Sequence, residues 1–219
     1  MFYAARFALL DSVNVLLIGV IVAVAVMVSP PGKYRGIVGR LILGDWLGVF
    51  VTAIPTLALF HLVKENVEAL LASPVLGVIL ILTGVFGVIM TLRGGDNSAL
   101  VDKILIPLKQ PGIKTVTTGF MLGAIQSLTS VPFFTGLAYL SVSGFSPLVN
   151  YAALFLYASL ALSLPTAVAV VMAVVRANPT SPVGKWFTAA RANSQRVSTY
   201  AAYAVSIILV LIGVLHLWH

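Results

Sequence analysis

Long apolar runs separated by short polar connections make up most of the chain. A helix needs about 20 mostly apolar residues to cross the hydrocarbon core of a bilayer. Runs of that length occupy roughly 5–28, 37–61, 71–92, 116–141, 147–175 and 199–218. Proline, glycine and asparagine, which interrupt helices, gather in the connections. The pattern therefore predicts an all-α polytopic membrane protein with six transmembrane helices.

The composition supports this prediction. Hydrophobic residues make up 60% of the 219 residues and charged residues only 9%, whereas a soluble domain carries about 25% charged residues. The first run is long enough to span a bilayer, so we expect an uncleaved first helix rather than a signal peptide. The chain has no cysteine, which excludes disulfides, thiolate metal sites and thiol redox relays.

Basic residues are distributed asymmetrically between the connections. All Lys and Arg residues except Arg6 and Lys64 follow the first, third or fifth run, as Lys33, Arg35, Arg40, Arg93, Lys103, Lys109, Lys114, Arg176, Lys185, Arg191 and Arg196. Cytoplasmic loops of membrane proteins carry such an excess. We therefore predict a multi-pass protein of the plasma (inner) membrane with cytoplasmic basic loops and both termini outside. Orientation and anionic lipid headgroups account for the net charge of +7 without a nucleic-acid partner.

The two halves of the chain resemble each other. The segment Asp11-Ser12-Val13-Asn14 in the first run matches Gln126-Ser127-Leu128-Thr129 in the fourth, and Pro55-Thr56 in the second matches Pro165-Thr166 in the fifth. Three spans per half would bring the second copy into the membrane from the opposite side, as in many secondary transporters. We predict two inverted three-helix repeats, 1–93 and 115–219, joined by a cytoplasmic loop at 94–114.

Asp11 and Asn14 are the first candidate site residues, because polar groups inside apolar spans mark binding or proton sites by default. They lie three residues apart and so share a helix face with Ser12 beside them. In the functional interpretation they bind a polar part of a cargo or a coupling proton. In the alternative interpretation they only cap a helix or bond to a neighbouring one, since Asp11 is about two turns into the run.

A second polar segment lies near the centre of the fourth run, and its members are Gln126, Ser127, Thr129 and Ser130. Pro132 follows and frees a backbone carbonyl one turn earlier. Freed backbone and hydroxyl groups favour a broken helix lining a cavity. The same groups could equally be ordinary interhelical hydrogen-bonding residues.

Candidates for gating or coupling are Asp45, Pro55, Thr56, Pro132, Pro165 and Thr166. Asp45 lies about one turn inside the second run, and we favour an ion pair with Arg40 or exposure to water over a coupling role. The fifth run is longer than a span needs, which suggests a tilt or a bend at Pro165.

Small residues recur every fourth position in the second, fourth and fifth runs, as Gly44, Gly48, Thr52 and Thr56; Thr115, Gly119, Gly123 and Ser127; and Ser159, Ser163 and Ala167. We interpret these stripes as helix-packing faces that meet at the centre of the protein.

His61, Glu65 and Glu68 have the side chains of a metal site, but beside Lys64 a solvated external turn is favoured. No nucleophile–base pair, phosphate loop or metal signature occurs, so neither an enzyme nor a cofactor is expected. Two cytoplasmic loops, 102–109 and 183–196, have the apolar and basic character of segments that lie among lipid headgroups.

These features together resemble the LysE superfamily of exporters, and within it the Sap/GAP family, the glycolipid-addressing proteins of mycobacteria and their relatives. The resemblance covers most of the chain and rests on the six spans, Asp11-Ser12-Val13-Asn14 and the Gly123–Pro132 segment. Where members usually carry Asn-Pro, this chain has Asn14-Val15, so no proline is present to break the first span. The resemblance implies export of glycolipids or related envelope lipids, with Asp11, Asn14 and the 126–132 segment as the site.

Three functions therefore remain open. The first is export of an amphiphilic envelope lipid to the cell surface, with membrane lipids as partners. The second is export of a small solute or cation driven by proton exchange at Asp11 or Asp45. The third is a scaffold that does not transport, and that recruits a larger lipid exporter or a cell-wall enzyme. A homo-oligomer also remains open as a partner. A pocket between the halves that opens sideways to lipid would favour the first over the second.

Overall fold

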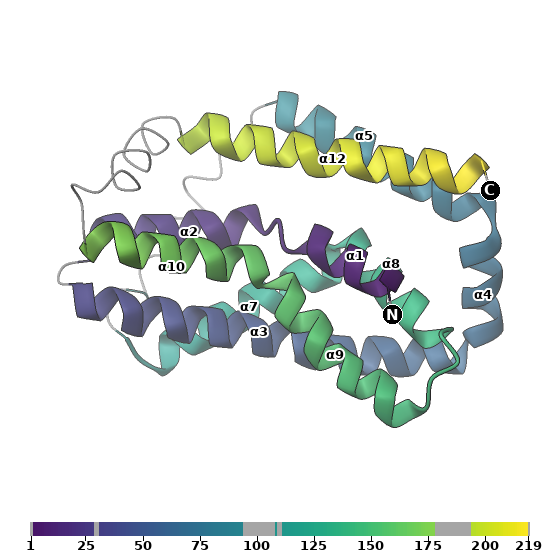
Figure 1. Cartoon of the computed structure of the whole chain (residues 1–219), viewed down its shortest axis with the longest axis horizontal. Helices are drawn as coiled ribbons and strands as arrows, with labels where there is room; N and C mark the ends of the chain where they lie inside the picture. Colours follow the sequence, from purple (N-terminus) through teal and green to yellow (C-terminus); the bar gives the residue numbers. More distant parts are fainter. Residues whose placement is uncertain (1, 29–30, 94–107, 109–110, 178–193, 219) are drawn as a thin grey trace.

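A computed structural model describes residues 2–28, 31–93, 108, 111–177 and 194–218, and all regular secondary structure in these ranges is helical (Figure 1). The helices are α1 (Phe2–Asp11), α2 (Val15–Met27), α3 (Pro31–Leu62), α4 (Lys64–Ala72), α5 (Pro74–Leu92), α7 (Ile113–Thr129), α8 (Val131–Ser141), α9 (Pro147–Ala161), α10 (Ser163–Ala177) and α12 (Ser194–Trp218). Each apolar run thus corresponds to one helix or to two consecutive helices.

Three of the expected spans are bent pairs of helices. The bends are 46° between α1 and α2, 74° between α7 and α8, and 43° between α9 and α10. Among the described residues, α3 and α5 are each long and apolar enough to cross a membrane, and the number rises to five if every bent pair is one span. Within α12, the segment Ser206–Trp218 is apolar. The described part of the protein is therefore all-helical, with apolar helices of membrane-spanning length.

Local chemistry explains each bend. Asn14 and Ser130 are the N-cap residues of α2 and α8, and the side chain of each accepts a hydrogen bond from a backbone N–H of the helix that follows. Such caps stabilise a new helix start inside an apolar run. The bend in the fifth run is at Leu162, three residues before Pro165, which lacks the N–H that would bond one turn back. The predicted bend is confirmed, whereas α3 continues without a break through Pro55.

Glycines let α3 and α7 pack backbone against backbone. A Cβ added at Gly44 or Gly48 would overlap the carbonyl of Val116 or Phe120, and one added at Gly119 would overlap the carbonyl of Leu41. The predicted small-residue stripes of these two helices are therefore packing faces, as small residues allow in membrane helices. This contact fixes α3, and with it Asp45, against the second half of the chain.

The α5–α12 pair forms a second close contact, through Gly77, Gly84 and Gly213. Figure 1 shows this pair running along one side of the other helices. A small apolar cluster that includes Leu76, Leu80 and Leu209 joins the pair to Phe7 and Ala138. The main core lies elsewhere, among α2, α3, α8, α9 and α10.

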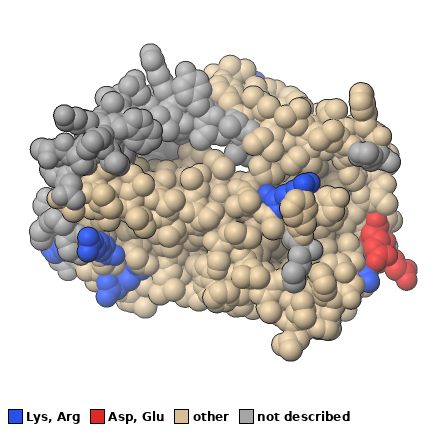
Figure 2. Space-filling view, in the orientation of Figure 1, with Lys and Arg blue, Asp and Glu red and all other residues tan. Residues whose placement is uncertain are grey.

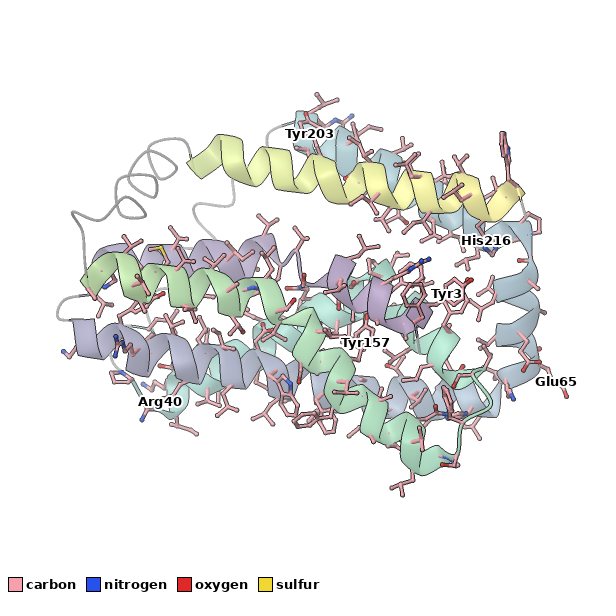
Figure 3. All side chains as sticks on the ribbon, viewed as in Figure 1. Tyr3, Arg40, Glu65, Tyr157, Tyr203 and His216 are labelled. Carbon is pink, nitrogen blue, oxygen red and sulfur yellow. The ribbon has the colours of Figure 1, made fainter. Side chains whose placement is uncertain are left out.

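Exposed basic side chains lie at one end of the molecule and exposed acidic ones at the other, and further basic side chains lie between them and beside the acidic ones. Figure 2 shows Lys and Arg side chains at the end where α3 begins and the acidic side chains beside α4, and Figure 3 places Arg40 and Glu65 at these two ends. Lys33, Arg35 and Arg40 were predicted in a connection, but helix α3 already begins at Pro31 and includes all three. The predicted external turn is likewise helical, with Glu65 and Glu68 on α4 and a Lys64–Glu68 ion pair of 3.5 Å. The loops at 102–109 and 183–196 fall largely outside the described residues.

Candidate functional site

The breaks in the first and fourth apolar runs meet. The hydroxyl of Ser130 donates a hydrogen bond to Oδ1 of Asp11 over 2.5 Å, although the residues are 119 positions apart. Asp11 is only 8% exposed and ends α1, while Ser130 lies in the gap between α7 and α8. A hydrogen bond to a charged group is shorter and stronger than one between neutral groups. The two polar segments singled out in the sequence therefore contribute to one place in the structure.

Two helix N-termini point toward this place. Oδ1 of Asn14 accepts from the N–H of Leu17 over 2.7 Å at the start of α2, and Oγ of Ser130 accepts from the N–H of Phe133 over 3.1 Å at the start of α8. A helix N-terminus carries a partial positive charge, which favours anionic groups. Asp11 is thus held beside the N-terminus of α8 through the residue that caps it. The capping role foreseen for the first segment is met by Asn14.

Asp45 provides a second buried carboxyl group. Its side chain is fully buried in α3, and neither carboxyl oxygen has a hydrogen-bond partner among the described residues. The backbone of Asp45 packs against Gly123 of α7, one turn before Ser127 on the same face of that helix. The favoured interpretation of Asp45 was wrong, because Arg40 bonds instead to the carbonyl of Gly36, at 3.0 Å. A buried carboxyl group without a partner is costly unless it binds a proton or a cation.

Ser127 and Tyr157 extend the polar surroundings. Ser127 is 1% exposed, and its hydroxyl has no partner in the described part of the chain. The hydroxyl of Tyr157 on α9 donates to the carbonyl of Pro132 over 3.3 Å. Gly136 makes room for the Tyr157 ring, since a Cβ there would overlap it. Tyr157 was not among the predicted site residues, because one tyrosine in an apolar run is a common packing residue.

The other predicted residues lie around the edges of this cluster. Ser12 is buried, and its hydroxyl donates to the carbonyl of Leu9 over 2.6 Å. Gln126 is half-buried, while Thr129 is exposed and donates to the carbonyls of Ile125 and Gln126 in its own helix. The structure therefore does not bring Thr129 to Asp11.

The predicted proline and threonine residues lie in different environments. Pro55 is exposed, and the hydroxyl of Thr56 donates to the carbonyl of Thr52 within α3. Pro132 is buried in the first turn of α8, next to the meeting point, and Pro165 is buried one turn after the bend between α9 and α10. Thr166 is exposed. Among the predicted prolines, Pro132 and Pro165 lie next to a bend between two helices, whereas Pro55 lies inside an unbroken helix.

Arg176 closes the end of α2 that is farther from Asp11. Its guanidinium group donates to the carbonyls of Ala25 and Val28. Carbonyl groups at a helix C-terminus lack partners within their own helix, and Arg176 supplies them here. The same group lies over the ring of Tyr34, 5.2 Å from its centroid, and the Tyr34 hydroxyl donates to the carbonyl of Ala169 over 3.2 Å. Arg176 was predicted in a cytoplasmic connection; it lies in the last turn of α10. The contact ties α2, α3 and α10 together at this end.

A groove of about 330 Å³ lies on the outer side of α3, between that helix and the α9–α10 pair. Its lining is mainly apolar and consists of Gly39, Ile42, Leu43, Trp46, Ser159, Leu162 and Thr166. The indole N–H of Trp46 donates to the hydroxyl of Ser159 over 3.2 Å across it. The groove is open to the surroundings and joins the first half of the chain to the second.

No protein-family model, curated protein or solved structure matches the chain. The residues themselves therefore carry the functional argument. Within the described ranges no three His, Cys, Asp or Glu side chains cluster as metal ligands would. The arrangement instead offers two buried carboxyl groups, a helix N-terminus beside one of them, and free hydroxyl capacity at Ser127. Such a site can take up and release a proton or bind a cationic or hydroxyl-bearing group.

Proposed function

We propose that the protein is a membrane transporter that exports an amphiphilic envelope lipid, and that its site is the cluster of Asp11, Ser130 and Asp45. The observation that carries the proposal is the Asp11–Ser130 hydrogen bond between two broken spans. Secondary transporters place substrate and coupling ions where discontinuous helices meet near mid-membrane. Asp45, buried without a partner beside this point, supplies the group that can respond to a proton or a cargo.

The proposal treats the chain as two inverted three-helix repeats, 1–93 and 115–219, in the plasma membrane. Supporting it, the first and fourth runs both break at a polar N-cap residue, Asn14 in one and Ser130 in the other. The Lys and Arg side chains at the end where α3 begins support a cytoplasmic position for that end. Under this orientation, Arg176 and Tyr34 close the cytoplasmic side of the site.

The open groove supports a lipid as the cargo. It lies between α3 and the α9–α10 pair, and the surrounding helix faces are apolar, including exposed Val51, Phe155 and Leu156. In a membrane such faces contact lipid tails, so the groove would open sideways into hydrocarbon. A polar headgroup would meet Asp11, Asn14 and Ser127 while its tails remain in the bilayer. The resemblance to the Sap/GAP family points to the same cargo class.

A second candidate is proton-coupled export of a small solute or cation, which the two buried carboxyl groups of Asp11 and Asp45 favour. The two functions differ in the route that the cargo takes. A lipid exporter needs the groove, so Gly39→Leu, which places a side chain in open space in the groove lining, would block it. A small-solute exporter would tolerate that change and still require Asp45.

The test is a comparison of surface and inner lipid pools in a deletion strain complemented with variants. We expect the unchanged chain to restore surface lipids and Asp11→Asn, Asn14→Ala and Asp45→Asn to leave them depleted by about tenfold or more. Glu65→Gln, at an exposed position on α4, is the control and should restore them. Unchanged surface lipids in the deletion strain would reject lipid export. Restoration by all three site variants would instead support a scaffold that recruits a larger exporter.

A further inference from the structure

We propose that the groove beside Trp46 binds one acyl chain of an anionic phospholipid whose headgroup pairs with Arg35. This inference goes beyond the transport proposal, because it requires only that the chain lies in a membrane. It concerns a phospholipid of the leaflet at the basic end of the molecule, which occupies the groove when no cargo is bound there.

Arg35 lies on the same face of α3 as the groove. Gly39, Ile42 and Trp46 follow Arg35 at distances of four, seven and eleven residues, and residues at these spacings lie on the same face of an α-helix. Its side chain is exposed, and no hydrogen bond or ion pair joins it to a described residue. Arg40, the neighbouring exposed arginine, lies on another face and is already bonded to the carbonyl of Gly36. Among the described residues, Arg35 is thus a free cation in line with the groove.

The dimensions fit one leaflet. Eleven residues of α-helix separate Arg35 from Trp46 by about 16 Å along the axis. Half of a hydrocarbon core is about 15 Å thick. A lipid with its phosphate at Arg35 would therefore place the end of an acyl chain beside Trp46, Ser159 and Leu162, at the bend between α9 and α10.

The lining selects an acyl chain over a polar ligand. Ile42, Leu43 and Leu162 are apolar, and the Trp46 indole N–H is already bonded to Ser159. Gly39 leaves open space, because a Cβ added there would meet no atom within 4 Å. The cationic side chain of Arg35 complements an anionic headgroup, and the apolar groove complements the acyl chain attached to it.

Tryptophan fluorescence provides the test, since Trp46 lies in the groove. Trp186 and Trp218 are replaced by Phe, and the full chain is reconstituted in bilayers containing phosphatidylglycerol or phosphatidylcholine with brominated acyl chains. We expect brominated phosphatidylglycerol to quench Trp46 at about fivefold lower mole fraction, the factor that about 1 kcal/mol for one basic residue provides. Arg35→Gln should abolish this preference, and Arg40→Gln should retain it. Gly39→Leu should reduce quenching by both lipids, whereas Gly19→Leu, also at an open position, should not.

Three outcomes would overturn the inference. Equal quenching by the two lipids in the otherwise unchanged protein would show that no anionic headgroup is selected. Loss of the preference in Arg40→Gln as well would show a diffuse surface charge rather than a site. Quenching that falls as protein density in the bilayer rises would show that a second copy of the chain covers the groove. Circular dichroism of each variant separates these results from failure to fold.

Discussion

Ser130 and Asp11 form the link between the two halves of the protein: the Ser130 hydroxyl donates to the Asp11 carboxyl group and at the same time accepts from the N–H of Phe133. One side chain therefore starts helix α8 and holds the carboxyl group that ends α1. This arrangement makes the break in the fourth span depend on the break in the first. It also gives a way to disturb both with a single substitution.

Ser130→Ala removes both bonds. Loss of an N-cap costs about 1 kcal/mol, and loss of a hydrogen bond to a charged group costs about 1.5–3 kcal/mol. We expect a fall in the free energy of unfolding of about 2–4 kcal/mol from these two terms, measured as a lower Tm in detergent. Ser146→Ala is the matched control, because Ser146 begins α9 without a side-chain cap bond. Equal effects of the two substitutions would show that the Asp11 contact contributes nothing.

Asp45→Asn separates stability from function. Asn keeps the shape of the side chain but cannot ionise, and the Asp45 oxygens have no hydrogen-bond partner to lose among the described residues. We expect the thermal stability to stay the same or rise, because the cost of burying a charge disappears. Transport should be lost, as is common when a destabilising functional group is removed. A large fall in Tm would show that Asp45 has a structural partner.

Gly119→Ala tests the packing of α3 on α7. The added methyl group would overlap the carbonyl of Leu41, so the helices must move apart. We expect a marked fall in Tm in detergent. Gly19→Ala places the same group in α2 where nothing lies within 4 Å, and it should be neutral or stabilise by up to about 1 kcal/mol, because alanine favours helix. A fall with Gly19→Ala of the same size would rule out helix contact as the cause.

The predicted orientation can be tested because the chain has no cysteine of its own. Single cysteines at Glu65 and Arg35 occupy exposed positions at opposite ends. With the basic end in the cytoplasm, a membrane-impermeant maleimide should label Glu65→Cys in intact cells and Arg35→Cys only after permeabilisation. The reverse pattern would invert the proposed topology.

The sequence predicted the helices well and their contacts only in part. Apolar runs set the helix positions, because a span needs a minimum apolar length. The break at Asn14 was not evident without a proline, because an asparagine in an apolar run can cap a new helix or bond to a neighbour, and tertiary packing decides between them. Asp45 was expected near water; the glycine contacts of α3 with α7 fix its position instead. Arg176 resembled an orientation signal, and only the folded chain shows that it caps α2.

Cross-linking of Asp11→Cys to Ser130→Cys tests the central claim most directly, with a protease site inserted in the 94–110 connection so that the halves can be separated. If the two breaks meet, oxidation in the membrane should hold the two fragments together on a gel, and a reductant should release them. The pair Asp11→Cys and Ser146→Cys, whose second position begins α9, should not cross-link. Fragments that separate after oxidation, although both cysteines react with maleimide in the denatured protein, would contradict a shared site.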